Sequence, residues 1–204
     1  MAAETEISAA REQVADARAR RSHPDSIEIL LDDVADAHYF VNDVIDIALV
    51  ALYHWVERDL KRILARSPRR PIASHMNVRD LHKEFAADGL QLGTIRDFRV
   101  VDLLRVFANS WKHNSGKVAE NVYAALKLRP PGPRDQHHFG HFANPQIAGA
   151  LRRRVRLGAN TPDAGLVAEY ARRAARFLDT VVRRASMGPP LKGSPATTRE
   201  ERFS

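Results

Sequence analysis

Residues 26–66 contain neither proline nor glycine, and their apolar side chains recur at steps of three and four. This spacing places side chains on one face of an α-helix. The positions on that face are Ile27, Leu30, Leu31, Val34, His38, Val41, Ile45, Ala48, Leu52, Trp55, Val56 and Ile63. The pattern predicts one long helix, or two helices on a shared axis, packed by this face against a bundle.

The rest of the chain is divided into shorter helices. We predict helices over 3–21 from its Ala, Arg and Glu content, over 77–88 and 144–157 from their capping residues, and over 97–113 and 160–186 from their apolar spacing. Asn144 is suited to cap the N-terminus of a helix that Pro145 begins and Gly158 ends. Residues 118–128 fit either a short helix or an extended segment. Because no stretch alternates as a strand would, the sequence predicts an all-α, antiparallel helical bundle.

The chain divides into three parts by composition. We predict an N-terminal helical extension over 1–24, ended by His23-Pro24. A helical bundle domain follows over 25–186, with a proline-rich break near 129–136. The remaining 187–204 are rich in Pro, Gly, Ser and charge, which predicts a disordered tail.

Several function classes are excluded by absent residues and motifs. The chain has no cysteine, which removes disulfides, thiolate nucleophiles and Cys-based zinc sites. It has no P-loop, Rossmann glycine pattern or GxSxG, so we predict no cofactor. The first residues are polar and acidic, unlike a signal peptide, and the longest uncharged apolar stretch, 47–56, is too short to cross a bilayer. We therefore expect a cytoplasmic protein without membrane association.

Two groups of residues contain side chains that can bind metal ions. The first group lies along the long helix and consists of Asp32, Asp33, Asp36, Asp43 and Asp46. We interpret them as a solvated face, since no ligand-bearing loop accompanies them. The segment 135–141 also holds Asp135, His137, His138 and His141. Flanking glycine and prolines favour a loop that is solvated or touches phosphate over a rigid metal site, so we predict no bound metal.

Charge is spread unevenly along the chain, whose net charge is +7. Residues 1–66 carry 8 basic and 13 acidic side chains, a net of −5, and residues 67–204 a net of +12. Such asymmetry suggests an anionic partner, with RNA the first candidate. The arginines that could follow a phosphate backbone are Arg152, Arg153, Arg154, Arg156, Arg172, Arg173, Arg176, Arg183 and Arg184. They could equally be solvated, or pair with an acidic protein.

One helix carries a constellation suited to chemistry. Arg105, Asn109 and His113 are four residues apart, with Lys112 one step aside, so they share a helix face near its end. Histidine can transfer protons near neutral pH, because its ordinary pKa is about 6.5. Lys112 and Arg105 could neutralise charge on a pentacoordinate phosphate, and Asn109 could orient a group by hydrogen bonding. This set suits metal-independent cleavage of RNA, whose 2′-hydroxyl is an internal nucleophile.

The segment Asn109-Ser-Trp-Lys-His113 resembles the signature helix of HEPN-type proteins, and Tyr53-His-Trp-Val-Glu57-Arg resembles that family's aromatic-plus-Glu helix. The resemblance spans roughly 26–128. It implies a four-helix core with extra helices, a metal-independent endoribonuclease of a toxin–antitoxin or phage-defence system, and an antitoxin or other protein partner. It also implies a homodimer in which two signature helices form one RNA-cleaving cleft. Where members often carry arginine this chain has Ala108, so Arg105, one turn back, or Lys112 would take its role.

The same residues also fit an ordinary helix end. Lys112 and His113 near a C-terminus are favoured by the helix dipole, and Asn114-Ser-Gly is a common helix stop. The alternative hypothesis is therefore a non-catalytic, dimerising interaction module, whose basic second half binds nucleic acid or an acidic partner protein. Ala108, in place of the family's arginine, favours this alternative.

Overall fold

A computed structural model describes residues 2–20, 23–66, 78–113, 120–130, 142, 144–158 and 163–187. Within these ranges the chain forms seven α-helices, one 3₁₀ turn and no strand, which confirms the all-α prediction. The elements are α1 (Ala2–Ala19), α2 (Pro24–Ala65), α3 (Val78–Ala87), η1 (Leu92–Thr94), α4 (Phe98–His113), α5 (Glu120–Leu126), α6 (Pro145–Val155) and α7 (Asp163–Ser186). A HEPN-like arrangement of the core stays a prediction. The predicted tail lies almost wholly outside the described residues.

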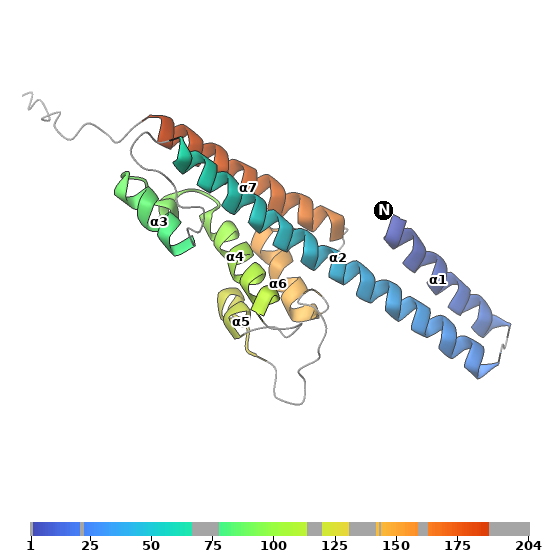
Figure 1. Cartoon of the computed structure of the whole chain (residues 1–204). Helices are drawn as coiled ribbons and strands as arrows, with labels where there is room; N and C mark the ends of the chain where they lie inside the picture. The colour runs from blue at the N-terminus through green and yellow to red at the C-terminus, as the bar shows by residue number, and fades with distance from the viewer. Residues whose placement is uncertain are drawn as a thin grey trace, which may run out of the picture.

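Helix α2 is the axis of the molecule (Figure 1). Helix α7 runs along its second half, and α4 crosses beneath the two and contacts both. Helix α3 covers the end of α2, α5 and α6 lie beside the far end of α4, and α1 folds back along the first half of α2. The first half of α2 therefore has α1 as a neighbour but extends beyond the bundle.

The prediction of one long helix is confirmed, but part of its predicted core face is wrong. The helix starts at Pro24 behind His23, whose ring accepts a hydrogen bond from the Asp25 amide. The apolar positions that are buried are Ile45, Leu49, Tyr53, Val56, Leu60 and Leu64. Trp55, predicted on the core face, is instead 37% exposed. This half of α2 is apolar nearly all round, so spacing alone could not decide which face α4 and α7 cover.

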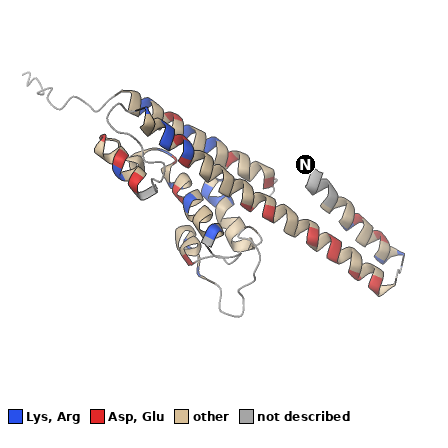
Figure 2. Cartoon of the chain, in the orientation of Figure 1, with Lys and Arg blue, Asp and Glu red and all other residues tan. Residues whose placement is uncertain are grey.

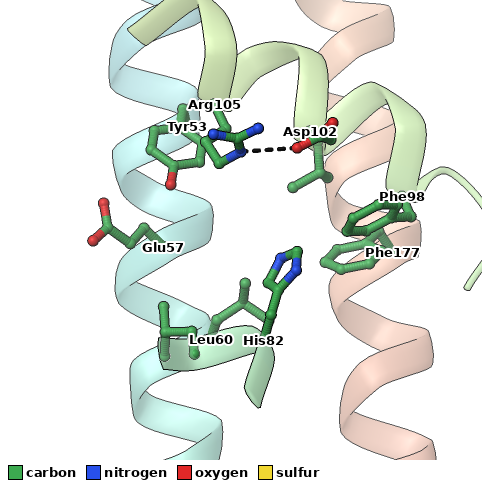
Figure 3. Close-up of a pocket in the computed structure, with 10 residues that line it drawn as sticks. Tyr53, Glu57, Leu60, His82, Phe98, Asp102, Arg105 and Phe177 are labelled. Atoms are coloured by element: carbon green, nitrogen blue, oxygen red, sulfur yellow. Dashed lines mark hydrogen bonds and ion pairs between the residues drawn. The ribbon is translucent and has the colours of Figure 1, made fainter. Parts of the chain in front are cut away.

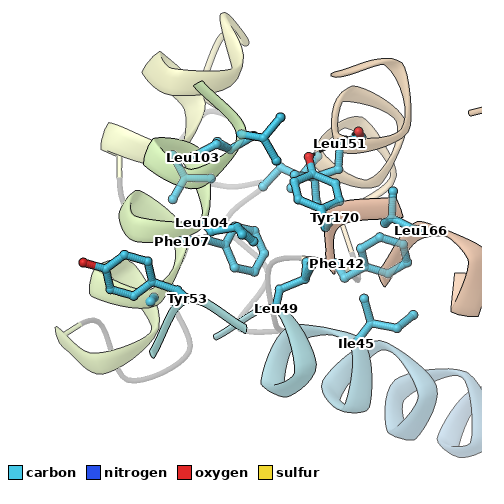
Figure 4. Packing of buried hydrophobic residues seen from close by; sticks show 14 of the residues in the cluster. Ile45, Leu49, Tyr53, Leu103, Leu104, Phe107, Phe142, Leu151, Leu166 and Tyr170 are labelled. Carbon is cyan, nitrogen blue, oxygen red and sulfur yellow. Dashed lines mark hydrogen bonds between the residues drawn. The ribbon is translucent and has the colours of Figure 1, made fainter. Parts of the chain in front are cut away.

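Two clusters of buried side chains join the helices. The first is shown in Figure 4 and combines α2, α4, α5, α6 and α7 around residues such as Leu49, Phe107 and Tyr170. The second joins α2, α3, α4 and α7 around Val56 and Phe177. Residues 118–128, for which the sequence left two alternatives, contain the helix α5.

The start of α6 matches its prediction and its end does not. The Asn144 side chain accepts hydrogen bonds from two amides of the first turn, and Pro145 occupies that turn. The helix ends at Val155, with Arg156 in a left-handed conformation at φ 63°. The Leu157 amide then bonds the Arg152 carbonyl at 3.0 Å, closing a Schellman-type cap. Leu157 packs against the core, which ends the helix before Gly158.

One of the aspartates predicted to be solvated is buried. Asp46 is fully inaccessible, and its two carboxylate oxygens accept from the Phe142 amide at 3.1 and 3.2 Å. Phe142 itself is inserted in the first core cluster. The other four aspartates of that group, Asp32, Asp33, Asp36 and Asp43, are exposed, as predicted. Asp46 therefore anchors a distant segment, because a buried carboxylate must find hydrogen-bond donors.

Candidate functional site

Helix α4, which carries the predicted site, is fixed along one side by the bundle. Leu104 and Phe107 are 1% exposed, and Ser110 is 2% exposed near the helix end. The helix contacts α2, α5 and α7. A helix packed in this way holds its remaining face in a defined orientation toward solvent.

Two predicted site residues lie on that solvent face. Asn109 and Lys112 are exposed, and His113 is the last residue of the helix. The His113 side chain lies outside the described part of the chain. Since Asn109 and His113 are one turn apart, their backbones lie within about 6 Å along the axis. We call Asn109, Lys112 and His113 the α4 terminus.

Arg105 is directed elsewhere. Its Nε donates to the Asp102 carboxylate at 2.8 Å, and its side chain is 32% exposed. Asp102 lies one turn toward the start of α4, whereas His113 lies two turns toward its end. The ion pair therefore draws the guanidinium away from the α4 terminus, and a phosphate role for Arg105 there would require this pair to open.

Ala108 occupies the position where the resembled family often has arginine. Its exposed fraction is 0%, and it belongs to the first core cluster. An arginine here would have to bury its guanidinium among apolar side chains, which is costly without a charged partner. The absence of arginine at this position thus fits the packing of α4.

Arg105 instead lines a narrow pocket between α2, α3, α4 and α7 (Figure 3). The polar residues around it are Tyr53, Glu57, His82, Asp102 and Arg105. The Tyr53 side chain is buried, and its hydroxyl has no hydrogen-bond partner among the described residues. Glu57 is engaged by Lys61 Nζ at 2.9 Å. The pocket is therefore lined by five titratable side chains, and none of them belongs to the α4 terminus.

Burial sets the protonation of two groups in this pocket. Burial, reinforced by the Glu57 carboxylate, raises the pKa of the Tyr53 hydroxyl. Burial also lowers the pKa of His82, a shift that Asp102 opposes and Arg105 reinforces. At neutral pH Tyr53 is therefore a neutral phenol and His82 is mainly a neutral imidazole. The ring of His82 packs on Phe98 with centroids 5.4 Å apart.

Part of this pocket can be recognised in the sequence. The resemblance indicates Tyr53 and Glu57, and the helical spacing indicates Arg105, but neither predicts that the three residues line one pocket. Asp102 could have been found, because an acid three residues before an arginine is a common helix pair. His82 gave no such signal, since it lies on another helix and meets the set only through tertiary packing.

Many of the predicted phosphate-binding arginines are engaged inside the molecule. Arg152 pairs with Asp163 and Arg172 with Glu169. Arg173 bonds Glu169 and the Val155 carbonyl, which caps the end of α6. The exposed arginines of α6 and the residue after it are Arg153, Arg154 and Arg156. Figure 2 shows that basic residues lie along α7 and beside α4 and α6, whereas the first half of α2 is mainly acidic.

No group of three His, Asp or Glu that could hold a metal ion occurs among the described residues. The segment 135–141, which contains His137, His138 and His141, lies outside the described residues. Comparisons with protein-family models, curated proteins and solved structures found no match for this chain. What is established is therefore the class, an all-helical protein with an exposed polar terminus on a packed helix.

Proposed function

We propose that the protein cleaves RNA at the α4 terminus, as a HEPN-like, metal-independent endoribonuclease of a toxin–antitoxin or phage-defence system. The observation that supports this most directly is the exposure of Asn109 and Lys112 beside His113, on a helix whose opposite side is buried. A flexible RNA strand can reach such a ridge, and a packed helix keeps the ridge in place.

The proposed reaction needs one proton carrier and one fixed cation. The His113 imidazole removes the proton of a 2′-hydroxyl, and that oxygen attacks the adjacent phosphorus. Lys112 neutralises the charge that builds on the phosphate oxygens, and Asn109 orients the phosphate or the imidazole by hydrogen bonding. The bond to the 5′-oxygen breaks, and that oxygen takes the proton from the imidazolium. The products are a 2′,3′-cyclic phosphate and a 5′-hydroxyl.

The test uses labelled total RNA incubated in EDTA with the wild-type chain and with His113→Ala. We expect cleavage by the wild type, none by the variant, and cyclic phosphate at the new 3′-ends. Lys112→Ala should slow cleavage by about 10²–10³-fold, as loss of one charge-stabilising group does. His23→Ala removes an exposed histidine of the α1–α2 connection and serves as the matched control. Equal cleavage by His113→Ala, or cleavage that requires a metal, would overturn the proposal.

A second function is favoured by a different observation. Ala108 is buried and Arg105 is held by Asp102, so the described part of α4 presents Lys112 as its exposed cation near the terminus. This supports a non-catalytic module, in which the exposed arginines at the end of α6 bind nucleic acid or an acidic protein. RNA binding that weakens steeply with salt, without any cleavage, would favour it. Arg153→Ala and Arg154→Ala should then reduce both the affinity and its salt dependence.

A further inference from the structure

The first half of α2 leaves large apolar side chains uncovered. Ile29 is 63% exposed, Phe40 64%, Val44 47% and Ile47 56%. Phe40, Val44, Ile47 and Ala51 are spaced at four, three and four residues, the spacing of a seam that packs against another helix. An uncovered apolar run of this size marks an interaction surface.

Helix α1 does not cover this seam. It lies on another side of α2, where Arg11 contacts the His38 ring at 2.8 Å and Ile7 and Val14 are buried. At about 100° per residue, His38 points roughly 160° away from Phe40 around the helix. The exposed fractions of the seam are those that remain with α1 in place.

Charged residues continue the seam in a definite order. Asp33 lies two turns before Phe40 on the same face, and Arg58 lies two turns after Ala51. Both are exposed, and Arg58 approaches its neighbour Asp59 only at 3.7 Å. We call the set Asp33, Phe40, Val44, Ile47, Ala51 and Arg58 the outer stripe. Along α2 it runs from acidic through apolar to basic.

We propose that the outer stripe binds the outer stripe of a second copy of this chain, with the two α2 helices antiparallel. A stripe ordered acidic–apolar–basic is complementary to itself when one copy is reversed, as a two-fold axis requires. With the axis between Val44 and Ile47, each Val44 meets Ile47 of the second copy. Phe40 then meets Ala51, a large residue against a small one, and Asp33 meets Arg58.

A parallel arrangement and a lipid surface fit the stripe less well. Parallel pairing would place Asp33 against Asp33 and Arg58 against Arg58, and like charges in contact are repelled. By length and apolar composition alone α2 could also cross a membrane. However, its opposite face packs against α4 and α7. Asp33 in the stripe, and Asp36 and Asp43 beside it, would also be repelled by anionic headgroups. These observations favour a second copy of the chain.

The area that the contact buries determines the dimer affinity that we expect. The contact between the two α2 helices can extend one turn beyond the outer stripe at each end, to the exposed Ile29 and Arg62. A helix is about 10 Å wide, and at ~1.5 Å of rise per residue the contact is then about 50 Å long. It would bury about 500 Å² per copy, near the lower limit for a specific interface. We therefore expect a dimer that dissociates at micromolar concentrations.

This dimer differs from the one that the HEPN resemblance implies. Helix α4 packs on the core side of α2, opposite the outer stripe. In the proposed dimer the two α2 helices are central and the two α4 helices lie on the outside, so the α4 termini do not share a cleft. The proposal is independent of RNA cleavage and can fail or hold without it.

The first test is charge reversal followed by sedimentation over a range of concentrations. Asp33→Arg should raise the dimer dissociation constant about tenfold or more, because two like-charged contacts appear per dimer. Arg58→Asp should do the same, and the double reversal should restore dimerisation. Asp32→Arg, an exposed aspartate off the stripe, is the matched control and should leave dimerisation unchanged. A wild-type chain that is monomeric at all concentrations would overturn the proposal. So would a dimer whose dissociation constant is the same in both single-reversal variants as in the wild type.

The second test fixes the orientation and uses the absence of native cysteine. Chains with Asp33→Cys and chains with Arg58→Cys, mixed under mild oxidation, should form a disulfide-linked dimer. Chains with Asp33→Cys alone should not, because these positions would be about 37 Å apart in the antiparallel arrangement. Cross-linking of Asp33→Cys chains alone would indicate parallel pairing and overturn the proposal. Adding vesicles of anionic lipid to the sedimentation samples tests the other occupant, and vesicle binding by a chain that stays monomeric would reject the dimer.

Discussion

The two halves of α2 belong to one continuous helix, yet they differ in what covers them. From Ile45 onward the helix lies against α4 and α7, and Leu49 and Val56 are 0% exposed. Before Ile45 no residue of α2 is buried, and Phe40 is 64% exposed although it is as apolar as its buried counterparts. Helical spacing therefore determines that the segment forms a helix, whereas the burial of its side chains depends on which other helices pack against it. The apolar stripe of the first half, which α1 leaves uncovered, is where we propose an interface.

We expect the largest loss of stability from truncating an aromatic side chain that covers the second half of α2, and we compare it with an aromatic side chain of the first half. Phe177 of α7 is fully buried in the cluster that holds the second half of α2. Phe177→Ala should lower the free energy of unfolding by about 3–5 kcal/mol. Phe40→Ala, its exposed counterpart, should change it by about 0.5 kcal/mol or less in the monomer. Urea denaturation at low protein concentration measures both, and comparable losses would mean that Phe40 is covered within the chain.

A second prediction concerns the ion pairs that attach α4 to α7 beside the covered half. Asp97 is 7% exposed, contacts Arg173 and Arg176 of α7, and has a left-handed φ of 65°. Asp97→Ala should cost about 1.5–3 kcal/mol of unfolding free energy, since the hydrogen bond from Arg176 and the ion pair with Arg173 are lost and alanine is strained at positive φ.

Asp97→Asn is the matched control, because asparagine tolerates the left-handed region. It should cost less than Asp97→Ala, because asparagine avoids the backbone strain and its side-chain oxygen can still accept a hydrogen bond from Arg176. An equal loss in the two variants would show that charge alone decides the position of α4.

A third prediction addresses the half that only α1 covers. Val14 is buried at 6% exposure against the first half of α2. Val14→Ala removes two CH₂ equivalents and should cost about 1.6 kcal/mol, at roughly 0.8 kcal/mol per buried CH₂. Faster hydrogen exchange should be confined to α1 and residues 24–44, because few buried contacts tie them to the bundle. Spread of the faster exchange into α4 and α7 would show that the two halves unfold together.

Much of the fold could be predicted from the sequence, because helix limits depend on local residues. Asn144 and Pro145 predicted the start of α6, and the lack of Pro and Gly predicted the length of α2. Trp55 and Asp46 were misplaced, since their burial depends on where α4 and the Phe142 segment come to lie. The spacing of Arg105 and Asn109 predicted a shared face. However, Arg105 forms an ion pair with Asp102 on the same helix and is directed away from Asn109. Helical spacing alone does not show which of these two neighbours Arg105 contacts.

The smallest expected effect is a pH dependence at the end of the covered half, where α3 packs. Burial lowers the pKa of His82 below its ordinary value near 6.5, so the folded chain prefers the neutral imidazole. The stabilisation is fully present above that ordinary value and is lost as the pH falls below it through the folded-state pKa. The midpoint temperature of thermal unfolding of the wild type should therefore decrease as the pH is lowered from about 7.5 to about 5, which is roughly the range of histidine titration. In His82→Phe, which keeps a ring against Phe98, and in His82→Gln, the fall should be smaller. If the unfolding temperature of both variants decreases as much as that of the wild type, protonation of His82 does not destabilise the folded chain. The contact of α3 with the covered half of α2 would then be looser than its packing indicates.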